Sequence, residues 1–133
     1  MLVVLQVKEG EVLGLRLLLI AFTEEDLPIG QIRFDRQTIA TDGGIHEARV
    51  TLSIDRCARG YGLAVEVVRL GLQAMEQHWG PGIEAIAEVL TTNNASNACF
   101  SRCSFTKEQI STDTPAVPSV NRWRKAYPYH PTQ

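Results

Sequence analysis

Residues 53–64 decide the fold of this chain: Ser53-Ile54-Asp55-Arg56-Cys57-Ala58-Arg59-Gly60-Tyr61-Gly62-Leu63-Ala64. Just before this stretch, residues 47–54 alternate between polar and apolar side chains, which predicts a half-buried strand. After it, the polar residues between 61 and 79 recur every three or four positions, which predicts a helix packed deeply against a sheet. The stretch is therefore expected to join a strand to a long helix through a glycine turn.

The other segments predict a sheet with one further helix. Strands are expected at 1–7, 13–22, 29–35, 83–90, 105–110 and 120–126, a short helix at 95–103, and a turn at Lys8–Glu11. The nearly continuous apolar run at 13–22 predicts a strand covered on both faces, and the last strand is expected at an edge. We expect one domain, residues 1–133, of class α+β, with a mixed, mostly antiparallel sheet, a central βαβ unit and flanking helices. Its C-terminal tail, residues 127–133, is expected to be flexible.

Composition excludes several classes of partner. The chain has 133 residues with 13 Lys and Arg against 15 Asp and Glu, so its net charge is −2. Such a balance provides no field to attract nucleic acid or an acidic membrane. The apolar run at 13–22 is shorter than the roughly 20 residues of a membrane helix. Three cysteines without a signal segment predict a cytoplasmic protein with reduced thiols, and Cys99 and Cys103 have no partners that would complete a metal site.

The glycine turn is also the segment with the clearest chemistry. Backbone N–H groups at the start of a helix are unpaired and lie at the positive end of its dipole, so they bind phosphate. Gly60 and Gly62 would allow a diphosphate to approach the main chain, and Arg59 could add a charged contact. The alternative is that both glycines only form a tight turn.

Three segments together resemble the GNAT superfamily of N-acetyltransferases, over about Leu15 to Phe105. Residues 59–64 match the family's Arg/Gln-x-x-Gly-x-Gly/Ala signature, at the start of a helix as the family requires. Residues 93–105 resemble its Asn-x-x-Ser-x-x-x-Tyr-x-x-x-Gly-Phe segment, although the tyrosine is here Phe100 and the glycine Ser104. Residues 29–34, Ile-Gly-Gln-Ile-Arg-Phe, resemble the pair of strands that precedes the family's cofactor-binding strand, which here is the strand at 47–54.

The resemblance implies acetyl-CoA as co-substrate, bound by a core at about 45–105. The strand that ends at Leu52-Ser53-Ile54 would separate from its neighbouring strand, at a bulge, so that its free backbone groups pair with the pantetheine arm of the cofactor. The diphosphate would lie on N–H groups from Gly60 to Ala64, the pantetheine near Asn93 and Asn97, and the sulfur beside Phe100. The cofactor-binding residues are thus expected to be Leu52, Ser53, Ile54, Arg59, Gly60, Tyr61, Gly62, Leu63, Ala64, Asn93, Asn97 and Phe100.

The implied activity is direct transfer of the acetyl group to a primary amine of a small acceptor, with an amino sugar suggested by the strand at 29–34. Glu47 or His46 is the candidate base; an ion pair of Glu47 with Arg49 is the alternative. The basic run 122–125 predicts a solvated edge strand or a contact to the adenosine phosphate.

Two departures from the family favour a different function, a non-catalytic CoA-binding module. Phe100 has no proton to give, and the family's two front helices are missing because few residues separate the first two strands. A homodimer partner could complete the acceptor site, or the site is open.

Overall fold

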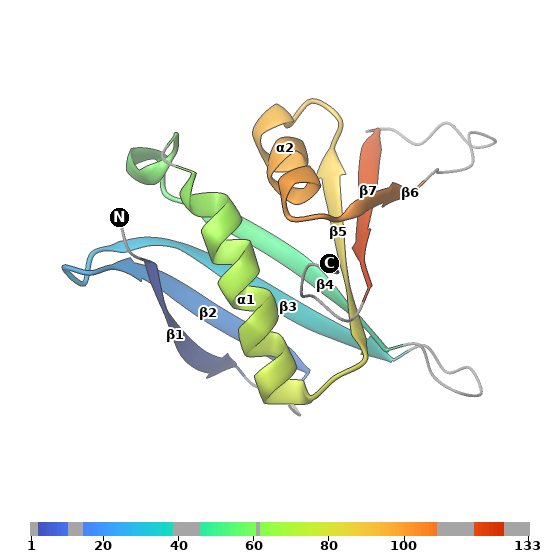
Figure 1. The fold of residues 1–133 in the computed structure, drawn as a ribbon, viewed down its shortest axis with the longest axis horizontal. Coiled ribbons are helices and arrows are strands. Elements are labelled where there is room, and N and C mark those ends of the chain that lie inside the picture. Colours follow the sequence, from blue (N-terminus) through green and yellow to red (C-terminus); the bar gives the residue numbers. More distant parts are fainter. Residues whose placement is uncertain (1–2, 11–14, 39–45, 61, 109–118, 127–133) are drawn as a thin grey trace.

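The computed structural model describes residues 3–10, 15–38, 46–60, 62–108 and 119–126, and its strands form one sheet (Figure 1). The strands are β1 (Val3–Gly10), β2 (Arg16–Thr23), β3 (Pro28–Thr38), β4 (His46–Ile54), β5 (Ile83–Leu90), β6 (Thr106–Glu108) and β7 (Val120–Lys125), and the helices are α1 (Leu63–Trp79), α2 (Asn94–Arg102) and the 3-10 turn η2 (Arg56–Ala58). Their order across the sheet is β1-β2-β3-β4-β5-β7-β6. Only β4 and β5 pair in parallel; the other neighbours are antiparallel. The fold class is therefore α+β, as predicted.

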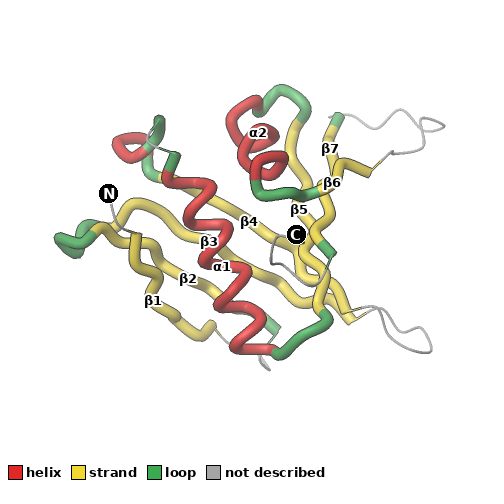
Figure 2. Tube along the Cα trace, in the orientation of Figure 1, coloured by secondary structure: helices red, strands yellow, loops and turns green. Residues whose placement is uncertain are grey.

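Both helices pack against the same face of the sheet (Figure 2). Alternate strand residues point toward them and are buried, for example Leu19 on β2 and Phe34 on β3. Gly71 brings α1 close to the sheet, since a Cβ there would lie 3.0 Å from Ile32 Cδ1. The narrow polar stripe of α1 thus reflects a helix that buries most of its surface.

The opposite face of the sheet is covered by no helix among the described residues. Here β2 is only half covered: Leu18, Ile20 and Phe22 are partly exposed between fully buried neighbours. The expectation that residues 13–22 are covered on both faces is therefore wrong. The apolar run of β2 has one buried face and one partly exposed face, so a continuous run of apolar residues does not require burial on both faces.

The remaining sequence predictions differ from the structure mainly at element ends. β1 continues to Gly10, paired opposite Arg16, so the turn expected at Lys8–Glu11 is misplaced. β7 lies between β5 and β6 and is not an edge strand; the three-residue β6 is the edge. The tail 127–133 lies outside the described residues. Neither helix in the described part of the chain has the length and hydrophobicity to cross a bilayer.

Asp35 makes a pH-dependent contribution on the helix-free face. Partial burial raises the pKa of Asp35, but hydrogen bonds from Arg16 at 2.6 Å and Arg33 at 2.9 Å outweigh it and lower this pKa below 3.8. A lowered folded-state pKa contributes stability above the unfolded pKa, and this contribution disappears as the pH falls through the folded pKa.

We therefore expect Asp35→Asn to lower the free energy of unfolding by about 0.5 kcal/mol near neutral pH, because the ion pairs are partly exposed. The difference from wild type should shrink as the pH falls below 3.8 and vanish once the pH is below the folded-state pKa of Asp35. Urea unfolding across this range measures it. Gln31→Ala, on the same strand and face, should show a pH-independent difference, and a loss for Asp35→Asn that persists at low pH would contradict the assignment.

Candidate functional site

β4 and β5 pair over only four residues each and then separate. Their paired residues run from His46 opposite Ile83 to Arg49 opposite Ile86, although β4 continues to Ile54 and β5 to Leu90. The separation predicted from the sequence is present. The expected bulge is not, because β3 and β4 pair in unbroken register. β4 therefore leaves β5 without a bulge, and beyond Arg49 none of the described strands pairs with its free side.

A glycine on β3 fits tightly against the free end of β4. Gly30 lies opposite Ile54, and a Cβ on Gly30 would lie 2.4 Å from the carbonyl oxygen of Ser53. Real side chains do not tolerate so short a contact, so β4 takes this path only because residue 30 has no side chain.

The opening between the two strands contains a cavity of about 260 Å³, which we call the splay cavity. Its walls come from β4, β5 and α2: Arg49, Val50, Thr51, Leu52, Ala87, Glu88, Val89, Leu90, Asn93, Ser96 and Phe100. Val50 and Val89 belong to the helix-covered face, whereas Thr51 and Glu88 alternate with them and belong to the other face. The splay cavity is therefore bounded by residues of both faces of the sheet.

A second cavity, of about 300 Å³, lies at the glycine turn, and we call it the turn cavity. Its lining residues are Leu52, Ser53, Ile54, Ala58, Arg59, Gly60, Leu63, Ala64, Asn93, Ala95, Ser96 and Cys99. Leu52, Asn93 and Ser96 line both cavities. The two cavities are therefore adjacent, and together they extend from the start of α1 to the opening between β4 and β5.

The geometry of the turn requires both glycines. Gly60 has φ +89° and Gly62 has φ +73°, a left-handed conformation that other residues adopt at a cost. A Cβ at either position would meet no atom within 4 Å, so open space lies beside the backbone. The first N–H groups of α1 lie just beyond, without partners in the helix. Arg59 Nε donates to Ile54 O at 3.1 Å, which ties the turn to the end of β4. Tyr61 lies outside the described residues.

Asn93 and Asn97 were both predicted to contact the pantetheine, and the structure separates them. Asn93 caps α2, its Oδ1 accepting from Ser96 N at 3.1 Å, and lines both cavities.

Asn97 instead links α2 to two strands. Its Nδ2 donates to Leu90 O at 3.0 Å and to Asn93 O at 2.9 Å. Its Oδ1 accepts from Asn121 Nδ2 at 3.1 Å and from Trp123 Nε1 at 2.9 Å. A primary amide has two donors and two acceptor lone pairs, so the side chain of Asn97 has no capacity left for a ligand.

Phe100 belongs both to the hydrophobic core and to the wall of the splay cavity. It is 3% exposed, and its ring centroid lies 5.0 Å from that of Phe105 in an edge-to-face arrangement. Cys99, one residue earlier, lines the turn cavity. A hydrogen bond with Cys103, together with burial, raises the pKa of the Cys99 thiol. Cys99 is therefore a neutral thiol at neutral pH and a poor nucleophile.

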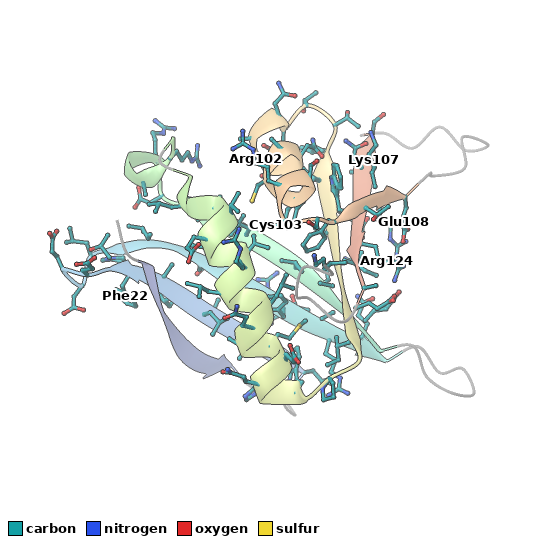
Figure 3. All side chains as sticks on the ribbon, in the orientation of Figure 1. Phe22, Arg102, Cys103, Lys107, Glu108 and Arg124 are labelled. Carbon is teal, nitrogen blue, oxygen red and sulfur yellow. The ribbon has the colours of Figure 1, made fainter. Side chains whose placement is uncertain are left out.

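Arg124 joins four strands at the closed end of the opening. Its Nη1 donates to Glu47 Oε2 on β4 at 2.6 Å and to Glu84 Oε1 on β5 at 2.7 Å, and its Nε donates to Glu108 on β6 (Figure 3). Burial disfavours the charge on Arg124, but hydrogen bonds to Glu108, Glu47 and Glu84 outweigh it and raise its pKa. Among the residues described, no cluster of His, Cys, Asp or Glu is suited to a metal ion.

This network decides where the candidate bases lie. The side chain of Glu47 is 8% exposed and bound to Arg124, not to Arg49 as the alternative had it. Glu47 precedes Leu52 by five residues, about 17 Å along an extended strand. His46 begins β4, and its side chain is outside the description. Glu47 lines neither of the cavities described above, so the structure does not bring this candidate base to the cofactor-binding candidates.

The structure adds cavity residues that the sequence did not single out. Ala58 and Ala95 line the turn cavity, and Thr51 lines the splay cavity. Alternation along 83–90 places Glu84 and Glu88 on one face of the strand. Nothing in the sequence distinguishes Glu84, which binds Arg124, from Glu88, which lines the splay cavity. The basic run 122–125 is likewise not a solvated edge: Trp123 is 8% exposed.

Comparisons with known proteins give structural matches only. No family model matches the chain, and no curated protein does. Solved structures similar to it include the ribosomal-protein-S5-alanine acetyltransferase from Vibrio fischeri, with 17% identity over 88% of this chain and 65% of that one and a TM-score of 0.67. Another is the GNAT domain of S. lividans PAT, with 23% identity over 84% of this chain and 61% of that one and a TM-score of 0.65. A third is RimL, a ribosomal L7/L12 alpha-N-protein acetyltransferase in complex with coenzyme A, with 17% identity over 85% of this chain and 63% of that one and a TM-score of 0.65.

The chain therefore has the fold of the GNAT N-acetyltransferases. It spans 61 to 65% of the length of these three structures.

Replacing Arg124 should destabilise the sheet at the closed end of the opening. Arg124→Leu leaves the buried Glu47 carboxylate without its cation, for which we expect a loss of about 3 kcal/mol in the free energy of unfolding. The double variant with Glu47→Gln removes that uncompensated charge and should recover part of the loss. Arg69→Leu, whose pair with Glu66 is exposed, should cost under about 0.5 kcal/mol. Equal effects of the two arginine variants in urea unfolding would contradict the role of Arg124.

Asn97→Leu tests whether this amide is structural. Because the change removes the acceptor of Trp123 Nε1 and of Asn121 Nδ2, we expect a loss of about 2 kcal/mol in the free energy of unfolding. The affinity of the folded protein for coenzyme A should change less than about threefold, since Asn97 lines neither cavity. Asn94→Ala, at the exposed start of α2, serves as control. An unchanged stability together with lost coenzyme A binding would show that Asn97 is a ligand-binding residue.

Proposed function

We propose that the chain is an acetyl-CoA-dependent N-acetyltransferase acting on a primary amine of a small acceptor. The observation that carries the proposal is the pair of adjacent cavities that runs from the glycine turn at the start of α1 to the opening between β4 and β5. A ligand with an anionic end, a long polar arm and a reactive thioester matches such a site.

The residues present fit coenzyme A. The amides at the start of α1 and the positive-φ glycines offer donors with open space beside them, suited to a diphosphate. Arg59 lines the same cavity and adds positive charge. Beyond Arg49, no strand in the described part of the chain pairs with the free side of β4, so its backbone can pair with an extended amide-containing arm as with an added strand. Asn93 lies where the two cavities meet.

The proposed acetyl transfer requires few catalytic groups from side chains. The lone pair of a neutral amine attacks the thioester carbonyl, the C–N bond forms, and the C–S bond breaks to release the thiolate. A free backbone N–H on the unpaired edge of β4 is suited to polarising the carbonyl. Phe100 has no proton to give, so the step depends on the thiolate as a fair leaving group. As a second part of the proposal, a homodimer partner completes the acceptor side, where an amino sugar is the acceptor suggested by the sequence.

Gly62→Val tests the cofactor site, with Gly80→Val as a matched control. Gly80 lies at the other end of α1, also at positive φ (+87°) with no atom near its Cβ position, so both changes cause similar strain. We expect coenzyme A at 100 times its Kd to stabilise the wild type and Gly80→Val by about 2.7 kcal/mol, and Gly62→Val by much less. Thermal shift measures the difference. Equal stabilisation of all three would show that the turn is only structural.

Release of free thiol from acetyl-CoA with a panel of primary amines tests the reaction itself. Turnover with any of them supports the acetyltransferase. Stabilisation by coenzyme A without turnover would instead support a non-catalytic binding module, and the absence of both would overturn the proposal.

A further inference from the structure

An ion pair crosses the opening on the helix-free face of the sheet. Arg49 Nη2 on β4 lies 2.9 Å from Glu88 Oε1 on β5. Arg49 is the last residue of β4 paired with β5, so the ion pair lies where the two strands part. Both residues also line the splay cavity. A positive and a negative group are thus placed together where an acceptor would enter from the face opposite the helices.

The ion pair differs from the one at the closed end of the opening in its exposure. The side chains of Arg49 and Glu88 are 52% and 37% exposed, whereas Glu47 in the Arg124 network is 8% exposed. Exposed pairs of this kind are weak, because water solvates both charges and screens them. A ligand can therefore replace each partner of Arg49 and Glu88 with little loss, which is not true of the buried pair.

Its position also distinguishes it from the other exposed ion pairs on this face, among them Arg122 with Glu108, which line neither cavity described above. Asp35 binds Arg16 and Arg33, but none of these three residues lines either cavity described above. Thr51 adds a hydroxyl to the wall of the splay cavity beside Arg49. Opposite charges at a weak pair next to a cavity are suited to a molecule that carries both charges itself.

We propose that Arg49 and Glu88 form the acceptor-recognition pair and select a small zwitterionic amine, one that carries a carboxylate or phosphate besides its amino group. The inference rests on the proposed acetyltransferase function. Glu88 binds the ammonium group, and Arg49, released from Glu88, binds the anionic group. An amino acid or a phosphorylated amino sugar has this pattern of charge, whereas a polyamine or an unsubstituted alkylamine lacks the anion.

The reaction with such an acceptor balances without any further reactant. The ammonium bound by Glu88 loses one proton to solvent through the open face and becomes a neutral amine. Its nitrogen forms the C–N bond as the C–S bond breaks, and the thiolate takes the second proton. The products are the N-acetylated acceptor, which keeps its anionic group but has lost its cationic charge, free coenzyme A and one released proton.

Three acceptors of equal length test the selection: 4-aminobutyrate, butylamine and putrescine. We expect kcat/KM for 4-aminobutyrate to exceed that of the other two at least tenfold. Arg49→Gln should lower kcat/KM for 4-aminobutyrate at least tenfold and so remove this preference, because it removes the partner of the carboxylate. Glu88→Gln should raise KM at least tenfold for all three amines. Glu66→Gln, which removes an exposed ion pair on α1, should leave every value unchanged.

A charge-swapped double variant, Arg49→Glu with Glu88→Arg, separates recognition from structure. It keeps an ion pair across the opening, so a merely structural pair would tolerate it with wild-type KM, which would overturn the inference. Recognition predicts that the preference for 4-aminobutyrate stays lost. A wild-type preference for butylamine or putrescine would overturn it as well.

Binding to the protein saturated with coenzyme A separates this inference from the proposed function. Suppose no amine is acetylated, but 4-aminobutyrate raises the Tm of wild type and not of the Arg49 or Glu88 variants. Acetyl transfer would then fail while the recognition pair stands. If no zwitterion binds and coenzyme A does, the inference is overturned.

Discussion

Two neighbouring strands that run parallel and then part need something to hold them together at one end and apart at the other. In this chain the first task belongs to Arg124, whose guanidinium reaches Glu47, Glu84 and Glu108 on three other strands. The second belongs to Asn97, which binds Leu90 O at the far end of β5 and both Asn121 and Trp123 on β7. β5 is thereby drawn toward β7 and away from β4. The cavities exist because these two sets of hydrogen bonds act at opposite ends of one strand.

The elements of the fold could be predicted because their signals are local. The period-two pattern of 47–54, the narrow polar stripe of α1 and the glycines between them all lie within about thirty residues. Strand order did not follow from such signals: Val120–Lys125 looked like a solvated edge because Arg122, Arg124 and Lys125 are charged. Only its place between β5 and β6 shows that the two arginines meet carboxylates of neighbouring strands, while Lys125 donates to the carbonyl oxygen of Cys103. A run of charged residues therefore does not by itself predict an exposed strand, because the charges can be paired with carboxylates on neighbouring strands.

The same distinction divides the candidate site. Most of the residues that line the turn cavity come from one segment, between Leu52 and Ala64, and the sequence identified all of these except Ala58, together with Asn93. Glu47 was a candidate base from its place on its strand, and Asn97 was a pantetheine contact implied by the family resemblance; in the structure the polar groups of both are bound within the protein. Glu88 and Thr51 come from strands joined by α1, and nothing in the sequence shows that they share a cavity. A cofactor held by main-chain groups leaves a compact sequence signal, whereas side chains gathered across a sheet do not.

Gly30 lines neither of the two cavities, yet it sets the course of the strand that walls both. A methyl group at this position would press on the carbonyl of Ser53 and displace the end of β4. The width of the opening is therefore a property of β3 as much as of the strands that border it. Substitutions that widen or narrow the site for a different ligand can be sought one strand away, where they touch no bound molecule and disturb none of its contacts directly.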